Sequence, residues 1–218
     1  MATPQRTGFR ALPTSRLEAF SDGVFAIAVT IIVLELGDPR HQTGHLAAAL
    51  LAQWPAYVAY VASFAYVGVI WLNHHQAFAR IAVADRRLLA LNLVLLFTVS
   101  VVAFPTGVLA DAMRERLNGT DAQTAVVLYA LIAALMCLSW VALYGYLRRH
   151  PELLVDGVEA NYVRHGLQRS AAGIGLYALG AVVGYFWLPV VALVIFALVP
   201  AFYFLTTEGF TGPDAPDA

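Results

Sequence analysis

The sequence predicts an all-α integral membrane protein with six transmembrane helices in each subunit. Composition is the first reason, because 60% of the 218 residues are hydrophobic, 12% are charged and the mean hydropathy is +0.70, which is too apolar for a soluble domain of this length. The second reason is a series of apolar runs, each close to the roughly 20 residues that a membrane-spanning helix needs. The third is the arginine distribution, since the arginines are concentrated in every second link between these runs.

The first three runs are separated by polar links. The first covers residues 16–36 and ends at the loop GDPRHQTGH. Residues 45–51 then form either a short interfacial helix or an extension of the second run, 54–78, which ends at the turn ARIAVADRR. The third run, 88–110, contains Pro105, where we expect a kink, and it stops at the polar segment DAMRERLNGTD.

The last three runs follow the same pattern of apolar stretch and polar link. The fourth covers 124–147 and leads into the long link RRHPELLVDGVEANYVRHG. The fifth, 167–187, contains a G-x-x-x-G motif from Gly180 to Gly184, which is typical of close helix packing in membranes. A tight turn joins it to the sixth run, 189–206.

Charge placement predicts the orientation. All thirteen positive residues are arginines, and ten of them lie before or at the start of the first run, between the second and third runs, or between the fourth run and the first turn of the fifth. The positive-inside rule therefore puts both termini in the cytoplasm. We expect a cytoplasmic tail at 1–15, a six-helix transmembrane domain at 16–207 and a disordered cytoplasmic tail at 208–218. A net charge of −1 indicates no nucleic-acid partner, and one cysteine, Cys137, excludes a disulfide framework.

Polar side chains lie deep in the first run. Asp22 lies about a turn and a half inside it, beside Ser21, and an ionisable residue at such depth has a functional or structural partner by default. Polar groups that meet in low dielectric satisfy one another, so we expect Ser21 and Asp22 to tie the first helix to the second and third; the alternative is a simple helix N-cap. Similar depth is reached on those helices by Asn73, His74, His75 and Asn92.

The opposite face of the first helix is apolar. At about 100° per residue, Ile27, Ile31 and Leu34 share one face, on the other side of the helix from Ser21 and Asp22. Without further information such a stripe faces lipid or packs against neighbouring helices. The same face also carries Phe20, Gly23 and Thr30.

One motif in the first helix is specific. Arg16, Phe20, Ser21, Asp22 and Gly23 form the pattern R-x-x-x-F-S-D-G. Together with WLNHHQAF and NLVLLFTVSVVAFPTGVL in the next two runs, this pattern resembles the transmembrane protein 175 family, potassium channels of endolysosomes and of prokaryotes. Animal members carry two six-helix repeats, whereas prokaryotic members carry one and form homotetramers. The resemblance therefore implies a single-repeat channel in a prokaryotic cell membrane, surrounded by lipid, with four subunits around a central pore.

The resemblance also implies roles for individual residues. In relatives the first helix lines the pore, and large apolar side chains on it form the constriction and gate; the matching positions here are Ile27, Ile31 and Leu34. Ile27 and Thr30 match positions that contribute to ion selectivity. A polar network near the intracellular end matches Arg16, Phe20, Ser21, Asp22, Gly23, Trp71, Asn73, His74 and His75, and the motif leaves open which histidine makes the key contact. Trp71 has the alternative role of an interfacial belt residue.

The implied mechanism does not use a carbonyl filter, since no T-V-G-Y-G motif is present. A ring of four isoleucines closes by dewetting when narrow, and when wider it forces partial dehydration of a passing cation. Potassium loses water more easily than sodium, so the expected function is passive cation conduction with a modest preference for potassium. No enzyme activity, cofactor or bound metal is expected beyond the permeant potassium ion.

Two other classes of protein compete with this interpretation. A proton-coupled secondary transporter would relay protons through Asp22 and a histidine of the second helix, but the sequence shows no inverted repeat. A membrane metalloenzyme would need clustered ligands. His74 and His75 diverge on their helix and the other four histidines fall in predicted loops, which makes the metalloenzyme the weaker alternative.

Overall fold

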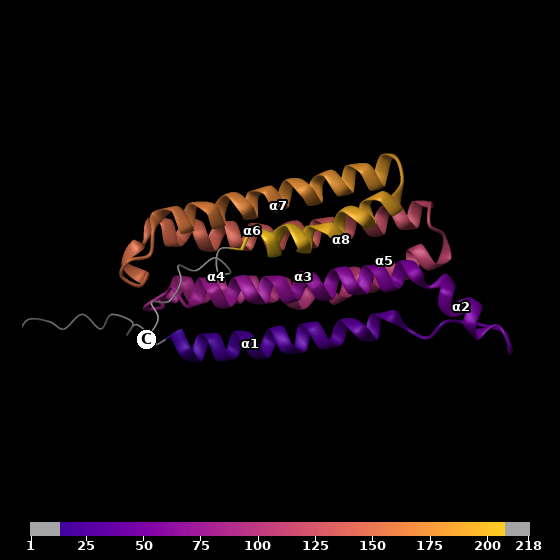
Figure 1. Cartoon of the computed structure of the whole chain (residues 1–218), viewed down its shortest axis with the longest axis horizontal. Helices are drawn as coiled ribbons and strands as arrows, with labels where there is room; N and C mark the ends of the chain where they lie inside the picture. Colours follow the sequence, from indigo (N-terminus) through magenta and orange to yellow (C-terminus); the bar gives the residue numbers. More distant parts are fainter. Residues whose placement is uncertain (1–13, 208–218) are drawn as a thin grey trace, which may run out of the picture.

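The computed structural model describes residues 14–207, which form a bundle of long helices with no β-strand in that range (Figure 1). This confirms the predicted all-α class. The tails predicted at 1–15 and 208–218 lie outside the described residues, apart from two residues that begin the first helix. In chain order the elements are α1 (Thr14–Ile31), η1 (Ile32–Leu36), α2 (Leu46–Ala52), α3 (Trp54–Phe78), α4 (Arg86–Val101), α5 (Ala103–Glu115), α6 (Thr120–Arg149), η2 (Pro151–Leu153), α7 (Ala160–Phe186) and α8 (Pro189–Leu205).

Four helical segments of the described chain are long and apolar enough to cross a membrane. They are Thr14–Leu36, Trp54–Phe78, Arg86–Glu115 and Thr120–Arg149. The helix Pro189–Leu205 is apolar but shorter, at 17 residues. All six predicted runs are helical. The second run coincides with α3, the sixth is one residue longer than α8, and the helices of the third, fourth and fifth runs begin before the predicted bounds.

Two local features of the chain explain where helices are interrupted. The third run divides into α4 and α5 at Val102, because Pro105 has no N–H to offer the carbonyl of Val101 one turn earlier. Residues 46–52 form a separate helix, α2, since the chain turns at Gln53 before α3 starts. Gln53 is buried there, and its side-chain amide donates to the carbonyl of Leu36 at 3.2 Å.

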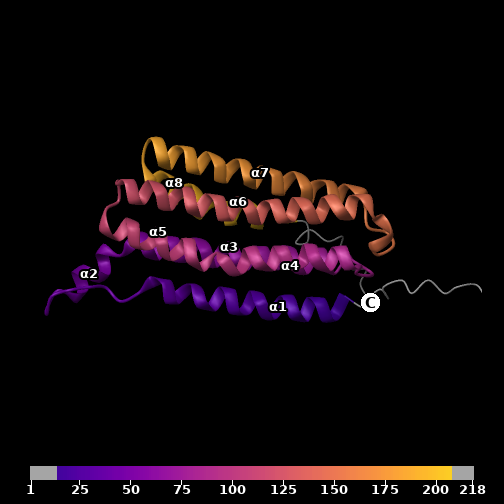
Figure 2. The same ribbon diagram turned by 180° about the vertical axis from the view of Figure 1, so that it is seen from behind.

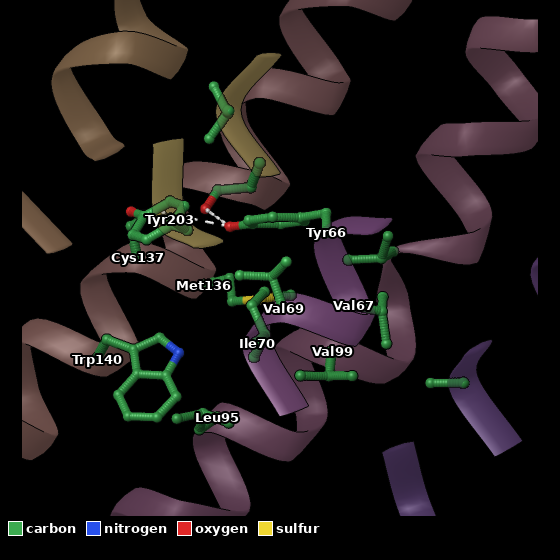
Figure 3. Close-up of a cluster of buried hydrophobic side chains, with 14 of the residues drawn as sticks. Tyr66, Val67, Val69, Ile70, Leu95, Val99, Met136, Cys137, Trp140 and Tyr203 are labelled. Carbon is green, nitrogen blue, oxygen red and sulfur yellow. Dashed lines mark hydrogen bonds between the residues drawn. The ribbon is translucent and has the colours of Figure 1, made fainter. Parts of the chain in front are cut away.

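The helices form three rows, which are visible from both sides of the bundle (Figures 1 and 2). α1 lies along one edge, α3 with α4 and α5 fill the middle, and the far row consists of α6 and α8 next to the middle with α7 outermost. Such packing between apolar helices in lipid relies on dispersion contacts. The buried side chains at the centre come from α3, α4, α6 and α8 (Figure 3): Tyr66, Val67, Val69, Ile70, Leu95, Val99, Met136, Cys137, Trp140 and Tyr203.

Glycines on α7 allow close contact within the far row, as the G-x-x-x-G motif predicts. A Cβ atom at Gly180 would lie 2.5 Å from Phe196 of α8, and one at Gly184 would lie 2.5 Å from Val126 of α6. Any larger residue at either position would therefore push a neighbouring helix away.

Candidate functional site

One face of the first helix is buried against the middle row. Leu17, Ser21, Phe25 and Ala28 of α1 are buried, and Ile32 continues the same face into η1. These positions recur every three to four residues, the spacing of one helix face. α1 therefore has a defined rotation, with this face against α3 and α4.

The opposite face of α1 is uncovered in the single chain. Ile27 is 63% exposed and Leu34 is 75% exposed, while Ile31 is partly buried at the edge of the face. Thr30 lies among them, and its hydroxyl donates to the carbonyls of Ala26 and Ile27, both at 2.9 Å. The helix thus presents Ile27 and Leu34 as bulky aliphatic side chains that the rest of the described chain leaves largely uncovered, with Ile31 packed partly against the core beside them.

A buried chain of hydrogen bonds joins α1 to α4 and α3. The Asn92 side-chain amide donates to the Ser21 hydroxyl at 3.0 Å, and Ser21 donates to the Leu17 carbonyl at 2.8 Å. His74 Nε2 lies 2.8 Å from the Asn92 amide oxygen, which only accepts, so Nε2 carries the hydrogen. Ser21, Asn92 and His74 are all buried, so Asn92 and His74 depend on this chain for their side-chain hydrogen bonds, and Ser21 also has the Leu17 carbonyl.

Asp22 has a different partner from the one expected. The indole Nε1 of Trp71 on α3 donates to the Asp22 carboxylate at 2.8 Å. In the described residues the hydrogen bond of Asp22 goes to Trp71 rather than to a histidine, although the charge of Asp22 still acts on the nearby His74. His75 is exposed and stacks on Trp71, with ring centroids 6.2 Å apart, whereas His74 is the buried histidine.

The other residues predicted for this polar network lie elsewhere. Asn73 is turned toward α7 and α8, where its amide oxygen accepts from Arg169 at 2.8 Å and from Thr207 at 3.1 Å. Arg16, Phe20 and Gly23 are exposed. Their spacing puts these three on the uncovered face of α1 with Ile27, because a helix turns by about 100° per residue.

Contacts at the other end of the helix were not predicted. Arg114 of α5 donates to the carbonyl of Leu36 at 2.6 Å, the same carbonyl that Gln53 reaches. The Glu35 carboxylate packs against Gly107, whose missing Cβ leaves room for it. The last carbonyls of any helix lack partners within the helix, and this general rule was the only signal in the sequence for such contacts.

Residues 14–207 contain no group of three or more His, Cys, Asp or Glu side chains able to hold a metal ion.

A polar contact at the start of α4 makes a testable prediction. Asp85 caps this helix by accepting from the Leu88 amide at 2.8 Å and also accepts from the Tyr146 hydroxyl of α6. Partial burial works against ionisation, but the hydrogen bonds from Tyr146, Leu88 and Arg87 prevail and hold the pKa of the Asp85 carboxyl below its ordinary value. The carboxylate therefore stabilises the fold above its unfolded-state pKa, about 3.9, and the contribution is lost as pH falls through the lower folded-state pKa.

We expect Asp85→Ala to lower the free energy of unfolding by about 0.5–2 kcal/mol at neutral pH. The gap between Asp85→Ala and the unmodified protein should narrow below about pH 4, where the Asp85 carboxyl of the unfolded state starts to be protonated while that of the folded state is still ionised. Thermal stability of the purified protein in detergent, measured across pH, tests this. Asp85→Asn is the control, because it keeps a cap acceptor without the charge, and a gap that stays constant with pH would contradict the prediction.

The fold and these contacts define a class: a multi-pass α-helical membrane protein whose first helix is held by polar contacts on one face and uncovered on the other. The family model described as endosomal/lysosomal potassium channel TMEM175 matches residues 16–103. A potassium channel of Streptomyces collinus is 42% identical over 161 residues, which cover 73% of this chain and 77% of the relative. The chain therefore belongs to the TMEM175 family, a family of ion channels and not of enzymes.

Two further comparisons agree. A potassium channel of Chamaesiphon minutus is 36% identical over 182 residues, covering 81% of this chain and 88% of the relative. The crystal structure of a lysosomal potassium-selective channel TMEM175 homolog from Chamaesiphon minutus matches with a TM-score of 0.73 and 33% identity, over 88% of this chain and 96% of that one. The resemblance that rested on the R-x-x-x-F-S-D-G motif is thus confirmed.

Proposed function

We propose that this protein is a potassium channel of a prokaryotic cell membrane, in which four copies of α1 surround a central pore. The uncovered aliphatic face of α1 is the observation that carries the proposal, since Ile27 and Leu34 are largely exposed while the opposite face is buried. Four such faces around one axis would be covered by one another. The bacterial relatives named as potassium channels support the permeant ion.

In the proposed assembly each subunit crosses the membrane six times and both termini are cytoplasmic. The helices α7 and α8 then supply the last two crossings. The arginine distribution supports this orientation. The arginine-containing links that precede α4 and α7 lie at the same end of the bundle as the start of α1 (Figure 1).

Ile27, Ile31 and Leu34 form the proposed constriction and gate. A narrow aliphatic ring empties of water and blocks ions, whereas a wider one passes a cation only after part of its hydration shell is removed. Potassium gives up water more readily than sodium, so a preference of roughly tenfold, equivalent to about 1.4 kcal/mol, is expected. Thr30 lies beside this ring and is the proposed secondary contributor to selectivity.

The polar contacts of α1 set the rotation of the pore helix in this proposal. Ser21 is linked through Asn92 to His74, and Asp22 is linked to Trp71. Turning α1 by one residue would move the aliphatic face by about 100° away from the axis and would break both links. The network therefore aligns the constriction without contacting the ion.

Flux measurements on the purified, reconstituted protein test the proposal. Liposomes that contain the full chain should show potassium-driven flux exceeding sodium-driven flux, and planar bilayers should show single-channel steps. Liposomes without protein are the control. The alternative, a proton-coupled transporter, would show no single-channel steps, and its potassium flux would require a proton gradient. The absence of single-channel steps, or a flux that requires a proton gradient, would overturn the channel proposal.

A further inference from the structure

A groove of about 820 Å³ opens between α4, α6 and α7. It lies toward the end of the bundle at which α1 begins, since α6 ends there and α7 starts there (Figure 1). None of its lining residues belongs to α1, so the groove is separate from the proposed pore helix. The lining residues are Leu91, Val141, Ala142, Gly145, Tyr146, Arg148, Arg149 and Leu167.

The two ends of the groove differ in chemistry. Leu91, Val141 and Leu167 make an apolar wall, whereas Arg148 and Arg149 stand at the terminus of α6, directly after the predicted apolar run. Both arginines are exposed, and the ion pairs found within residues 14–207 involve neither of them. Two positive charges therefore lie at one end of a groove that has an apolar wall.

Two carboxylates that contact the last turns of α6 or the residue after it already have partners. The Asp85 carboxylate accepts from the Leu88 amide and from Tyr146, which lines the groove. Glu152 accepts from His150 Nδ1 at 2.8 Å. These carboxylates do not line the groove, which leaves the arginine end able to receive a negative group.

We propose that this groove binds an anionic phospholipid, with its phosphate on Arg148 and Arg149 and an acyl chain along the apolar wall. Guanidinium groups match the planar oxygen geometry of phosphate, and basic pockets at the end of membrane helices attract acidic headgroups. Arg148 and Arg149 also complement the dipole of α6, because positive charges are favourable in the last turn of a helix. This dipole does not explain why an apolar groove adjoins the two arginines. A soluble anion would leave that wall unused, which is why the occupant is a lipid.

Native mass spectrometry of the full-length protein in detergent tests the proposal, using dioleoylphosphatidylglycerol and dioleoylphosphatidylcholine as probes. The unmodified protein should bind the anionic lipid at least about tenfold more tightly, and Arg148→Gln combined with Arg149→Gln should remove about tenfold of that affinity. Arg164→Gln, at an exposed arginine of α7 outside the groove, is the matched control and should leave binding unchanged.

Gly145→Leu provides a second test that keeps both charges. A Cβ at Gly145 meets no atom within 4 Å, so a larger side chain enters the groove without displacing a helix, and binding should again weaken. Equal binding by the double glutamine variant, equal loss in Arg164→Gln, unchanged binding in Gly145→Leu, or displacement of the lipid by excess inorganic phosphate would each overturn the proposal. This measurement does not depend on ion conduction, so its failure leaves the channel proposal intact.

Discussion

Replacing Ile27 by asparagine is expected to raise cation leak and to remove most of the preference for potassium over sodium. The side chain is 63% exposed on the uncovered face of α1, where we propose that four copies form the constriction. A polar ring keeps water in the pore and lets sodium pass without losing its hydration shell. The expected loss is roughly tenfold in permeability ratio, about 1.4 kcal/mol, with a smaller effect for Ile27→Ala.

Bilayer recordings under bi-ionic conditions measure this ratio from the reversal potential. Leu138→Asn is a suitable control, because Leu138 is an exposed apolar residue of α6 rather than of α1. The control should keep the normal ratio and the normal closed-state leak. If both Ile27 variants behave like the control, α1 does not line the pore at this position.

The second large effect is expected for Asn92→Leu. Asn92 is fully buried and bonds to both Ser21 and His74, so leucine, which is similar in size, leaves the buried His74 Nε2 without a partner and removes the donor to Ser21, which keeps its bond to the Leu17 carbonyl. A buried polar group left without a partner costs about 1–3 kcal/mol. The variant should therefore lose thermal stability and, because α1 is no longer held in rotation, most of its potassium current.

Thermal unfolding in detergent, combined with liposome flux, measures both consequences. The double variant Ser21→Ala with Asn92→Leu should lose less free energy of unfolding than the two single variants lose in sum, since the two residues share one hydrogen bond. Asp22→Ala is a useful comparison, because its bond to Trp71 is exposed in the single chain and should matter less for the stability of the subunit. An Asn92→Leu protein with normal stability and normal current would contradict the anchoring role.

The helices themselves were predictable because the physics that sets them is local. A bilayer demands about 20 apolar residues per crossing, and the six apolar runs coincide with helices α1, α3, α4 with α5, α6, α7 and α8. Pro105 marked the interruption of the third run, since it has no N–H to donate to the carbonyl of Val101. Helical periodicity alone also separated the aliphatic face of α1 from the face that carries Ser21.

Partner choice was less predictable because it depends on how the neighbouring helices are rotated. Asn73, His74 and His75 were expected at the depth of Asp22, with Trp71 in the same network, yet adjacent helix positions point about 100° apart. In the structure Trp71 reaches Asp22, His74 reaches Asn92, and Asn73 reaches Arg169, which lies 96 positions further along the chain. The rotation of each helix is selected by its packing against several other helices at once. The sequence pattern within one helix does not determine it.

From the sequence alone came the membrane class, the helical runs, the family resemblance and the two faces of α1, because each depends on spacing within a short stretch of chain. Only the tertiary structure decided that the indole of Trp71, and not an imidazole, pairs with Asp22, that His74 rather than His75 is buried, and that Arg114 and Gln53 hold the carbonyl of Leu36. These contacts join residues from separate helices, so they exist only once the helices have packed in three dimensions.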